Sequence, residues 1–336
     1  MKNRIKSLYL AIALTTKCNF RCFYCKEGGE SISESKEEIP FDELKRIITI
    51  AYDIGINSFR ITGGEPTIAS YFGELLKFIV ELGNDTRIRI NTNGYNLQQF
   101  VDIIQAHKER FDIVISIDSL SEYINGVHYP KYLSKKIQIL TKDLVNRGIT
   151  VRYNVVVTKI NFTEIEQLII KAVDEMKVNL KLLDLNKQEE YLGEKEIKNA
   201  YQEMSTQLWN DLYVPLEKLQ PFLENISEQY KPEYHQWISY GIPMSAYFRN
   251  GHMIQLKDSS KGANYSKICI EKCPYFKTCQ EGVFSPFLST NLILHVSGCK
   301  NTDIHFDLKG KDEYSIRNSF NKILKLFEDV SIQKNF

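Results

Sequence analysis

The segment 9–26 reads YLAIALTTKCNFRCFYCK, a short apolar run followed at once by three cysteines. The run Tyr9–Leu14 is typical of a strand that is buried in a parallel sheet. Cys18, Cys22 and Cys25 follow it with the spacing CxxxCxxC. Three thiolates can hold a [4Fe–4S] cube by three of its irons and leave the fourth iron open to a small chelating molecule. The segment therefore predicts a strand that leads directly into a cluster-binding loop.

Closely spaced cysteines also occur in zinc sites and as small buried hydrophobic residues, so the spacing alone leaves these alternatives open. A second motif, ITGGEP at 61–66, lies after a second predicted strand and before a predicted helix. Its adjacent Gly63 and Gly64 let the backbone approach a ligand closely, and the Glu65 carboxylate can hold an ammonium group. The two motifs together favour a cluster that works with a small amino-containing molecule.

The first half of the chain alternates between strand and helix patterns. Further strands are expected at 58–62, 87–92, 113–117, 150–158 and 179–183. Helices are expected from about Pro40 and at 71–82, 97–110, 131–147 and 163–176. Six strands alternating with helices predict an α/β fold, a partial (βα)6 TIM-like barrel. Active residues of such barrels gather at the carboxyl ends of strands, where Cys18, Gly63, Asn93, Ser116 and Asp118 fall.

The CxxxCxxC motif, with the aromatic Tyr24 before its last cysteine, and the later GGEP resemble the radical S-adenosylmethionine (SAM) superfamily. The resemblance implies that SAM chelates the open iron and is cleaved to a 5′-deoxyadenosyl radical, which abstracts hydrogen from a substrate. An electron donor such as flavodoxin or ferredoxin is then an expected partner. The cluster ligands implied are Cys18, Cys22 and Cys25. The residues implied to hold the methionyl amine are Gly63, Gly64 and Glu65, and Glu65 is also the candidate catalytic residue.

Further stretches at 91–95, 116–120, 152–157 and 161–165 are similar to the MoaA-like branch of the superfamily, whose type member is a GTP 3′,8-cyclase. The similarity covers about residues 8 to 185. Its implied contacts to SAM, besides Tyr24, are Asn93, Ser116, Asp118 and Asn154. These residues also have ordinary structural explanations, because Asn-Gly is a common turn and Ser-x-Asp often caps a helix.

A second cysteine group follows near the end of the chain, around a predicted hairpin at 287–296. It resembles the twitch appendage of MoaA-like enzymes, a small domain that binds an auxiliary [4Fe–4S] cluster, and its spacing is also similar to that of the larger SPASM appendage. A zinc site with four cysteine ligands is the alternative. The candidate ligands are Cys269, Cys273, Cys279 and Cys299. The expected domains are a barrel at 1–185, a helical connector at 186–255 and a twitch-like domain with a C-terminal helix at 256–336.

The chain also departs from the cyclase pattern. It lacks the arginine of the first strand and the glycine-rich tail of that enzyme. Arg60, Arg152 and Lys181 are expected at the barrel rim, where they could bind phosphate or simply extend their charges to solvent. The expected function is therefore a radical SAM enzyme acting on a small molecule or nucleoside. One alternative is a peptide maturase, which is less favoured because the separate amino-terminal peptide-recognition domain of such enzymes is not expected in this sequence. The other alternative is a non-catalytic iron–sulfur or zinc protein.

The amino-acid composition limits the cellular compartment and the classes of partner that can be expected for this protein. The 43 Lys and Arg residues nearly balance the 42 Asp and Glu residues, which argues against non-specific nucleic-acid binding. No apolar run is long enough to span a membrane, and Leu8–Leu14 lacks the length of a signal peptide. Seven cysteines, an odd number in two groups, do not suggest a secreted disulfide framework. A cytoplasmic protein is expected.

Overall fold

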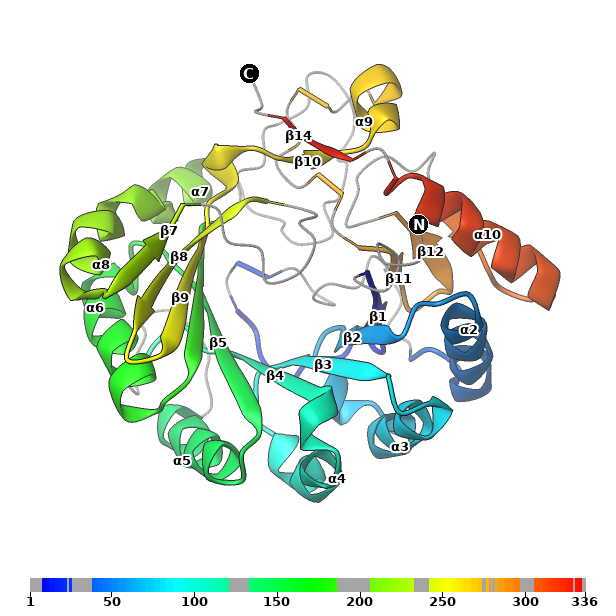
Figure 1. Cartoon of the computed structure of the whole chain (residues 1–336), viewed down its shortest axis with the longest axis horizontal. Helices are drawn as coiled ribbons and strands as arrows, with labels where there is room; N and C mark the ends of the chain where they lie inside the picture. The colour runs from blue at the N-terminus through cyan, green and yellow to red at the C-terminus, as the bar shows by residue number, and fades with distance from the viewer. Residues whose placement is uncertain are drawn as a thin grey trace.

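The computed structural model describes residues 8–22, 24–25, 38–120, 133–185, 206–232, 242–273, 276–277, 279, 282–283, 285–296, 305–328 and 330–333. Six parallel strands stand side by side in chain order, as the sequence predicts. They form the arc of an open barrel in Figure 1. These strands are β1 (Tyr9–Ala13), β2 (Ser58–Thr62), β3 (Arg87–Thr92), β4 (Phe111–Ser116), β5 (Thr150–Val156) and β6 (Asn179–Leu183).

Helices cover the outer face of this arc (Figure 1). They are α2 (Phe41–Asp53), α3 (Phe72–Leu82), α4 (Val101–Ala106), α5 (Leu133–Asn146) and α6 (Phe162–Ile170). Alternate strand residues such as Ile88 and Ile90 pack under the helices, because side chains of a strand point to opposite faces in turn. Their neighbours, such as Arg89, therefore face the inside of the barrel.

Two of the predicted helices are divided into shorter pieces. The expected helix 97–110 consists of η2 (Leu97–Phe100), α4 and η3 (Lys108–Arg110). The expected helix 163–176 consists of α6 followed by one π-helical turn, η4 (Lys171–Glu175). Another 3₁₀ turn, η1 (Pro66–Ile68), follows β2 directly.

The parallel sheet is larger than the sequence predicts. β9 (His252–Lys257) pairs in parallel with β6, and β11 (Phe287–Leu288) pairs in parallel with β1. Antiparallel strands extend both edges, with β7 (Gln229–Lys231) and β8 (Met244–Arg249) beyond β9. On the other side, β12 (Ile293–His295) and β13 (His305–Asp307) follow β11. The described chain thus forms a sheet of twelve strands, eight of them parallel.

These strands correct the prediction of a helical connector at 186–255. The segment does contain α7 (Thr206–Leu212), η5 (Leu216–Leu219) and α8 (Gln220–Ile226). It also contains β7, β8 and part of β9, so a boundary at residue 255 would cut through a strand of the barrel sheet. The prediction failed because β9 lies next to β6 through a pairing between residues more than 70 positions apart.

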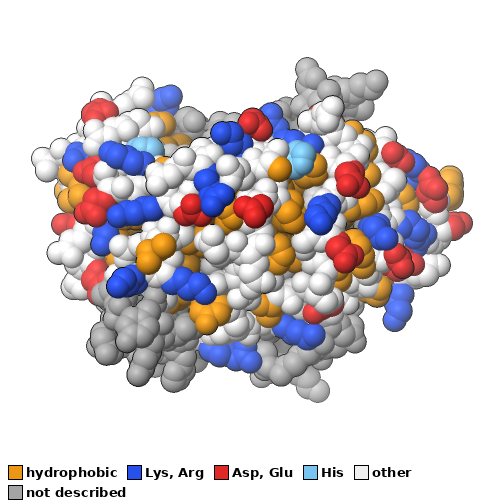
Figure 2. All heavy atoms as spheres, turned by 90° about the horizontal axis from the view of Figure 1, so that it is seen from below, with side chains coloured by type: hydrophobic (Ala, Val, Ile, Leu, Met, Phe, Trp, Pro, Cys, Tyr) orange, Lys and Arg blue, Asp and Glu red, His pale blue; other side chains and the backbone are white. Residues whose placement is uncertain are grey.

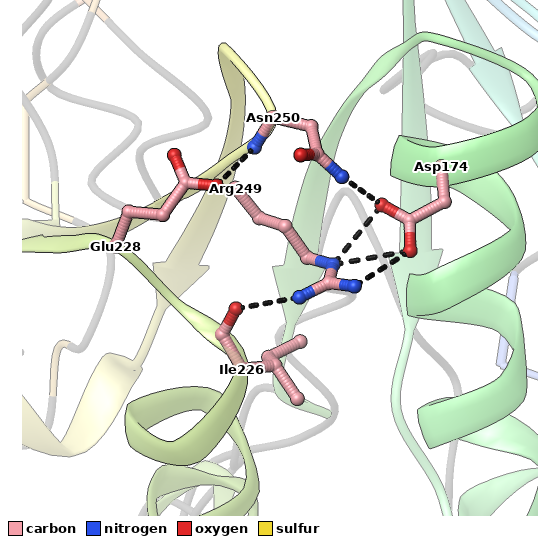
Figure 3. A network of polar contacts seen from close by, with 5 residues as sticks. All are labelled: Asp174, Ile226, Glu228, Arg249 and Asn250. Atoms are coloured by element: carbon pink, nitrogen blue, oxygen red, sulfur yellow. Dashed lines mark hydrogen bonds and ion pairs between the residues drawn. The ribbon is translucent and has the colours of Figure 1, made fainter.

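A polar network attaches the β8–β9 hairpin to the outer helices (Figure 3). The Arg249 guanidinium donates to both oxygens of Asp174 at 2.9–3.1 Å and to the Ile226 carbonyl oxygen at 2.8 Å. The Asn250 amide also donates to Asp174, at 2.7 Å. The hairpin is therefore anchored to both η4 and α8.

The C-terminal segments lie across the open side of the arc in Figure 1. There η6 (Ser259–Lys261) leads to β10 (Ala263–Tyr265), which pairs with β14 (Ser331–Gln333) and is followed by α9 (Lys267–Lys272). Helix α10 (Glu313–Lys325) packs beside α2, and an ion pair of 2.8 Å joins Arg317 to Asp53. The C-terminal third therefore contacts both ends of the barrel arc.

The face seen from below in Figure 2 carries acidic and basic side chains interspersed with single apolar ones. No region of one charge sign dominates this face. Within the described ranges, no helix combines the length and the apolar character that crossing a membrane requires.

Candidate active site

The cysteine loop after β1 is joined to the GGE loop after β2 by backbone hydrogen bonds. The Gly64 N–H donates to the Thr15 carbonyl oxygen at 2.7 Å, and the Glu65 N–H donates to the Lys17 carbonyl oxygen at 2.8 Å. The two motifs, which lie 38 positions apart from Cys25 to Gly63, therefore form one continuous rim at the carboxyl ends of neighbouring strands.

Both glycines are required by this contact. A Cβ on Gly64 would overlap the Lys17 carbonyl oxygen, and a Cβ on Gly63 would lie 2.5 Å from the Thr15 carbonyl oxygen. Gly63 also has a φ of 142°, which side chains rarely adopt. The sequence explained these glycines by close approach to a ligand, whereas in the structure they first allow close approach to the cysteine loop.

Glu65 is fully buried and accepts four hydrogen bonds from the protein. Its Oε1 accepts from the Thr67 N–H at 3.1 Å, the Thr67 hydroxyl at 2.5 Å and the Thr92 hydroxyl at 2.6 Å. Its Oε2 accepts from the Asn93 N–H at 2.7 Å. Burial raises the pKa of Glu65 although these four donors oppose the shift. The carboxylate thus ties the ends of β2 and β3 together, and among the described residues Oε2 has one donor.

Asn93 continues this network to the cysteine loop. Its side-chain N–H donates to Asn19 Oδ1 at 2.8 Å, and its Oδ1 accepts from the Tyr95 N–H at 3.0 Å. Burial raises the pKa of Cys18, and a hydrogen bond with the Asn93 side chain is among the contacts that oppose this shift. Asn93 therefore lies directly beside the first cysteine of the motif.

Tyr24 connects the cysteine loop to the opposite side of the rim. Its hydroxyl donates to Asp118 Oδ2 at 2.5 Å, and Asp118 Oδ1 accepts from the Val156 N–H at 3.0 Å. Asn161 also joins the segments at the ends of β4 and β5, because its side-chain amide donates to the carbonyl oxygens of Asp118 and Val156. The ends of β4 and β5 are thereby fixed to the residue that precedes Cys25.

Ser116 and Asn154 are cross-strand partners on β4 and β5. Ser116 is exposed, whereas Asn154 is partly buried and its Oδ1 has no hydrogen-bond partner among the described residues. A buried, unpaired carbonyl oxygen is costly, and a ligand hydroxyl or N–H would relieve that cost. Asn154 is thus suited to a ligand contact.

Cys18, Cys22 and Cys25 lie in one loop, and Cys25 is the most exposed of the three. Burial, together with the charges of Asp118, Cys25 and Cys18, raises the pKa of Cys22 to about 12. Such thiols become ligands only when a metal displaces their protons. Among the described residues no set of three ligating side chains surrounds a point fit for a single metal ion.

Ligands of a [4Fe–4S] cube bind different irons, so they need not converge on one point. The donor set, the glycine contact and the open Asn154 oxygen therefore fit a three-cysteine cluster with SAM. The cysteines, Tyr24 and the GGE loop all lie at this rim, together with Asn93, Ser116, Asp118 and Asn154. Sequence reasoning missed the supporting residues Asn19, Thr67, Thr92 and Asn161. Their polar side chains follow strand ends, but only the fold shows what they contact.

Three of the four cysteines in the second group, Cys269, Cys273 and Cys279, lie among the residues that the structure describes. Cys269 is buried in α9, and the Cys273 N–H donates to its carbonyl oxygen at 3.2 Å, so both thiols belong to one helical turn. The Tyr265 hydroxyl donates to the Cys279 carbonyl oxygen, and the Tyr265 ring packs edge-on against Phe276. Cys299, the fourth candidate ligand, lies outside the described residues. The predicted hairpin at 287–296 is present as β11 and β12.

Arg60, Arg152 and Lys181 are not at the rim where the sequence placed them. They occupy inward positions in the middle of β2, β5 and β6. Arg60 and Arg152 are only 8% and 7% exposed, so their charges do not extend to solvent. A charged residue between apolar ones is compatible with a rim position, but in the structure these residues lie in the middle of their strands and face the inside of the arc.

Comparison with known proteins agrees with this geometry. The family model of the Radical SAM superfamily matches residues 12–172. A GTP 3′,8-cyclase of Campylobacter lari is 33% identical over 164 residues, which is 48% of this chain and 50% of the relative. A GTP 3′,8-cyclase of Actinobacillus pleuropneumoniae is 28% identical over 179 residues, which is 52% of this chain and 49% of the relative. The chain thus spans about half the length of the curated relatives it matches.

A solved structure of anSMEcpe with bound AdoMet shares the fold over 98% of this chain and 81% of its own, with a TM-score of 0.55 and 17% identity. That likeness supports the α/β barrel and its C-terminal extension as a fold. The sequence motifs, the hydrogen-bonded rim formed by the cysteine and GGE loops, and the family match agree with one another. Residues 12–172 therefore form the radical SAM domain that characterises radical SAM enzymes, and over this domain the chain is homologous to the GTP 3′,8-cyclases.

Proposed function

We propose that the protein cleaves SAM reductively at its N-terminal rim and uses the resulting radical to abstract hydrogen from a small molecule. The observation that carries this proposal is the joining of the CxxxCxxC loop to the GGE loop by hydrogen bonds of 2.7 and 2.8 Å. Cys18, Cys22 and Cys25 would hold a [4Fe–4S] cluster, and the GGE backbone with Glu65 would hold the methionyl amine. When bound, the cluster and SAM supply an organic radical.

The protein groups have distinct tasks in this scheme. The hydrogen bonds of Tyr24 and Asn93 hold the cysteine loop against the ends of β3 and β4. Asn154 offers its unpaired oxygen to a ribose hydroxyl or to an N–H of the bound molecule. Such fixed contacts favour one orientation of the bound molecules and thereby lower the entropic cost of reaction.

A small-molecule substrate is favoured by the inside of the barrel, where polar side chains of β3, β5 and β6 face inward below the rim. An electron donor such as flavodoxin or ferredoxin would supply the reducing electron. Cys269, Cys273, Cys279 and Cys299 would hold an auxiliary [4Fe–4S] cluster. The proposed compartment is the cytoplasm, where thiols stay reduced.

The test is the release of 5′-deoxyadenosine by anaerobic, reconstituted protein after reduction with dithionite. The parent protein should release it slowly, and the Cys18→Ala, Cys22→Ala, Cys25→Ala triple variant should release none. If the parent releases none under strong reduction, with cell metabolites or candidate peptides present, the proposal is wrong. Faster release with a peptide than with metabolites would identify a peptide maturase instead.

A further inference from the structure

Tyr265 and Ser266 connect the end of β10 to α9 and contact two of the candidate ligands of the auxiliary cluster. These elements lie together across the open side of the arc (Figure 1). The Tyr265 hydroxyl donates to the Cys279 carbonyl oxygen. The Ser266 hydroxyl oxygen lies 3.4 Å from the Cys269 sulfur, which is a hydrogen-bond distance for sulfur. One short segment thus contacts both cysteines.

The Ser266 side chain does not have the usual task of a serine at its position. Ser266 is the N-cap residue of α9, where a serine oxygen ordinarily accepts from a backbone N–H of the first turn. Its side chain makes no such bond, and the helix begins instead with the Ser266 carbonyl oxygen, which accepts from the Cys269 N–H at 3.0 Å. Among the described residues, the Cys269 sulfur is the hydrogen-bond partner of this hydroxyl.

Both members of this contact are buried, so the direction of the hydrogen bond matters. Ser266 is fully buried and Cys269 is 6% exposed. In the free thiol either atom can donate. A metal-bound cysteine is a thiolate, which carries no proton and can only accept. The hydroxyl therefore donates to the sulfur when Cys269 is a ligand, and the bond is then charge-assisted.

The described cysteines of this group fit the ligands of an iron–sulfur cluster. Cys269 and Cys273 lie on one helical turn, because the Cys273 N–H donates to the Cys269 carbonyl oxygen at 3.2 Å. Their side chains and that of Cys279 pack with the hydrophobic core. A bare thiolate in apolar surroundings is costly, so these sulfurs suit a metal centre that compensates their charge. A hydroxyl donor beside one sulfur compensates part of the same charge.

We propose that the Ser266 hydroxyl donates a hydrogen bond to the Cys269 sulfur and thereby raises the reduction potential of the auxiliary [4Fe–4S] cluster. Reduction adds negative charge that the ligand sulfurs share, so a donor to sulfur stabilises the reduced form more than the oxidised form. Ser266 acts through Cys269 and is thus a positioning residue. The inference rests on the auxiliary cluster of the proposed function and is independent of SAM cleavage.

The experiment is an anaerobic redox titration of the full-length Cys18→Ala, Cys22→Ala, Cys25→Ala triple variant, whose remaining cysteines all belong to the second group. Adding Ser266→Ala should lower the one-electron reduction equilibrium constant about tenfold, which is a fall of about 59 mV in the midpoint potential. The iron content should stay at about four per chain. Ser266→Thr and Ser266→Val are a second pair, equal in size, and the potential should be lower in Ser266→Val because it lacks the hydroxyl.

Ser259→Ala is the matched control, because it removes another buried hydroxyl, which donates to Asp184 and not to a sulfur. Its potential should equal that of the triple variant. The same potential with and without the Ser266 hydroxyl in both pairs, an equal fall in Ser259→Ala, or zinc in place of iron in the triple variant would each overturn the inference. Because the triple variant is expected not to cleave SAM, a fall in potential without 5′-deoxyadenosine release by the parent would refute the activity alone.

Discussion

The hydroxyl of Tyr24 donates a 2.5 Å hydrogen bond to the carboxylate of Asp118, which is 94 positions away in the chain and only 6% exposed. Tyr24 immediately precedes Cys25, and Asp118 follows β4. The bond therefore spans the mouth of the barrel from the first strand to the fourth. It fixes the last cysteine of the motif relative to the strand ends that face SAM in our proposal.

Tyr24→Phe should slow the release of 5′-deoxyadenosine about tenfold or more without lowering the iron content. The variant removes one hydrogen bond to a buried carboxylate, an interaction worth about 1.5–3 kcal/mol. Tyr95→Phe is the matched control, because Tyr95 packs against Phe20 of the same loop through its ring. Equal rates for the parent and Tyr24→Phe would show that this bond does not position the site.

Glu65→Gln should weaken both the fold of the rim and the binding of SAM. The Glu65 carboxylate accepts four hydrogen bonds, from groups of Thr67, Thr92 and Asn93. The side-chain NH2 of a glutamine would instead face some of these donors and could not accept their hydrogen bonds. We expect a loss of SAM affinity of about tenfold to a hundredfold, since a charge-assisted hydrogen bond is worth about 1.5–3 kcal/mol. Equilibrium binding of SAM and the Tm should be measured together.

A lower Tm with unchanged SAM affinity would assign Glu65 a purely structural role. Thr67→Val serves as the control for that role, because it removes one of the same hydrogen bonds and leaves the carboxylate in place.

Gly64→Ala should prevent the two loops from joining, because the new methyl group would overlap the Lys17 carbonyl oxygen. The expected result is loss of most of the N-terminal cluster, which halves the iron content from about eight to about four per chain if both clusters form. Gly73→Ala is the control, since its methyl group would meet side-chain atoms alone, the Phe100 ring at 3.3 Å and Ile103 at 3.9 Å. Full iron content in Gly64→Ala would contradict the close approach of the loops.

Asp174→Asn should lower the urea midpoint at pH 7, and its difference from the parent should shrink as the pH falls below 3.8. Hydrogen bonds from Arg249 and Asn250 lower the pKa of Asp174 below its usual 3.8. A lowered folded-state pKa contributes stability above pH 3.8, and the contribution disappears as the pH falls through the folded value. We expect about 1 kcal/mol at pH 7, the upper end for a surface ion pair, because the geometry is bidentate.

The control for this measurement is Asp102→Asn, whose carboxylate is almost fully exposed and lies 3.7 Å from Arg147. A destabilisation of Asp174→Asn that persists unchanged at pH 2 would mean that the charge is not responsible.

Local sequence signals predicted the strands β1 to β6, because each is a short apolar run with a turn or a helix after it. They also predicted the rim, since residues at the carboxyl ends of parallel strands share one edge. They did not predict that Arg152 and Lys181 lie in the middle of their strands and face the inside of the arc, or that β9 and β11 extend the sheet. Those features depend on pairings such as Leu180 with Ile254, which leave no trace in local periodicity.

The pairing of β11 with β1 and of β9 with β6 has a consequence for how the chain is made. Leu288 of β11 is translated 105 residues after Leu183, the last residue of β6. At about 5–20 residues per second the ribosome needs roughly 5–20 s to cover that interval. The first strand lacks its partner β11 throughout that time, and the sixth strand lacks its partner β9 until Lys257, which is 74 residues after Leu183. The nascent barrel therefore exposes unpaired strand edges, the feature through which sheets aggregate. Expression at a rate that outpaces closure should therefore favour inclusion bodies.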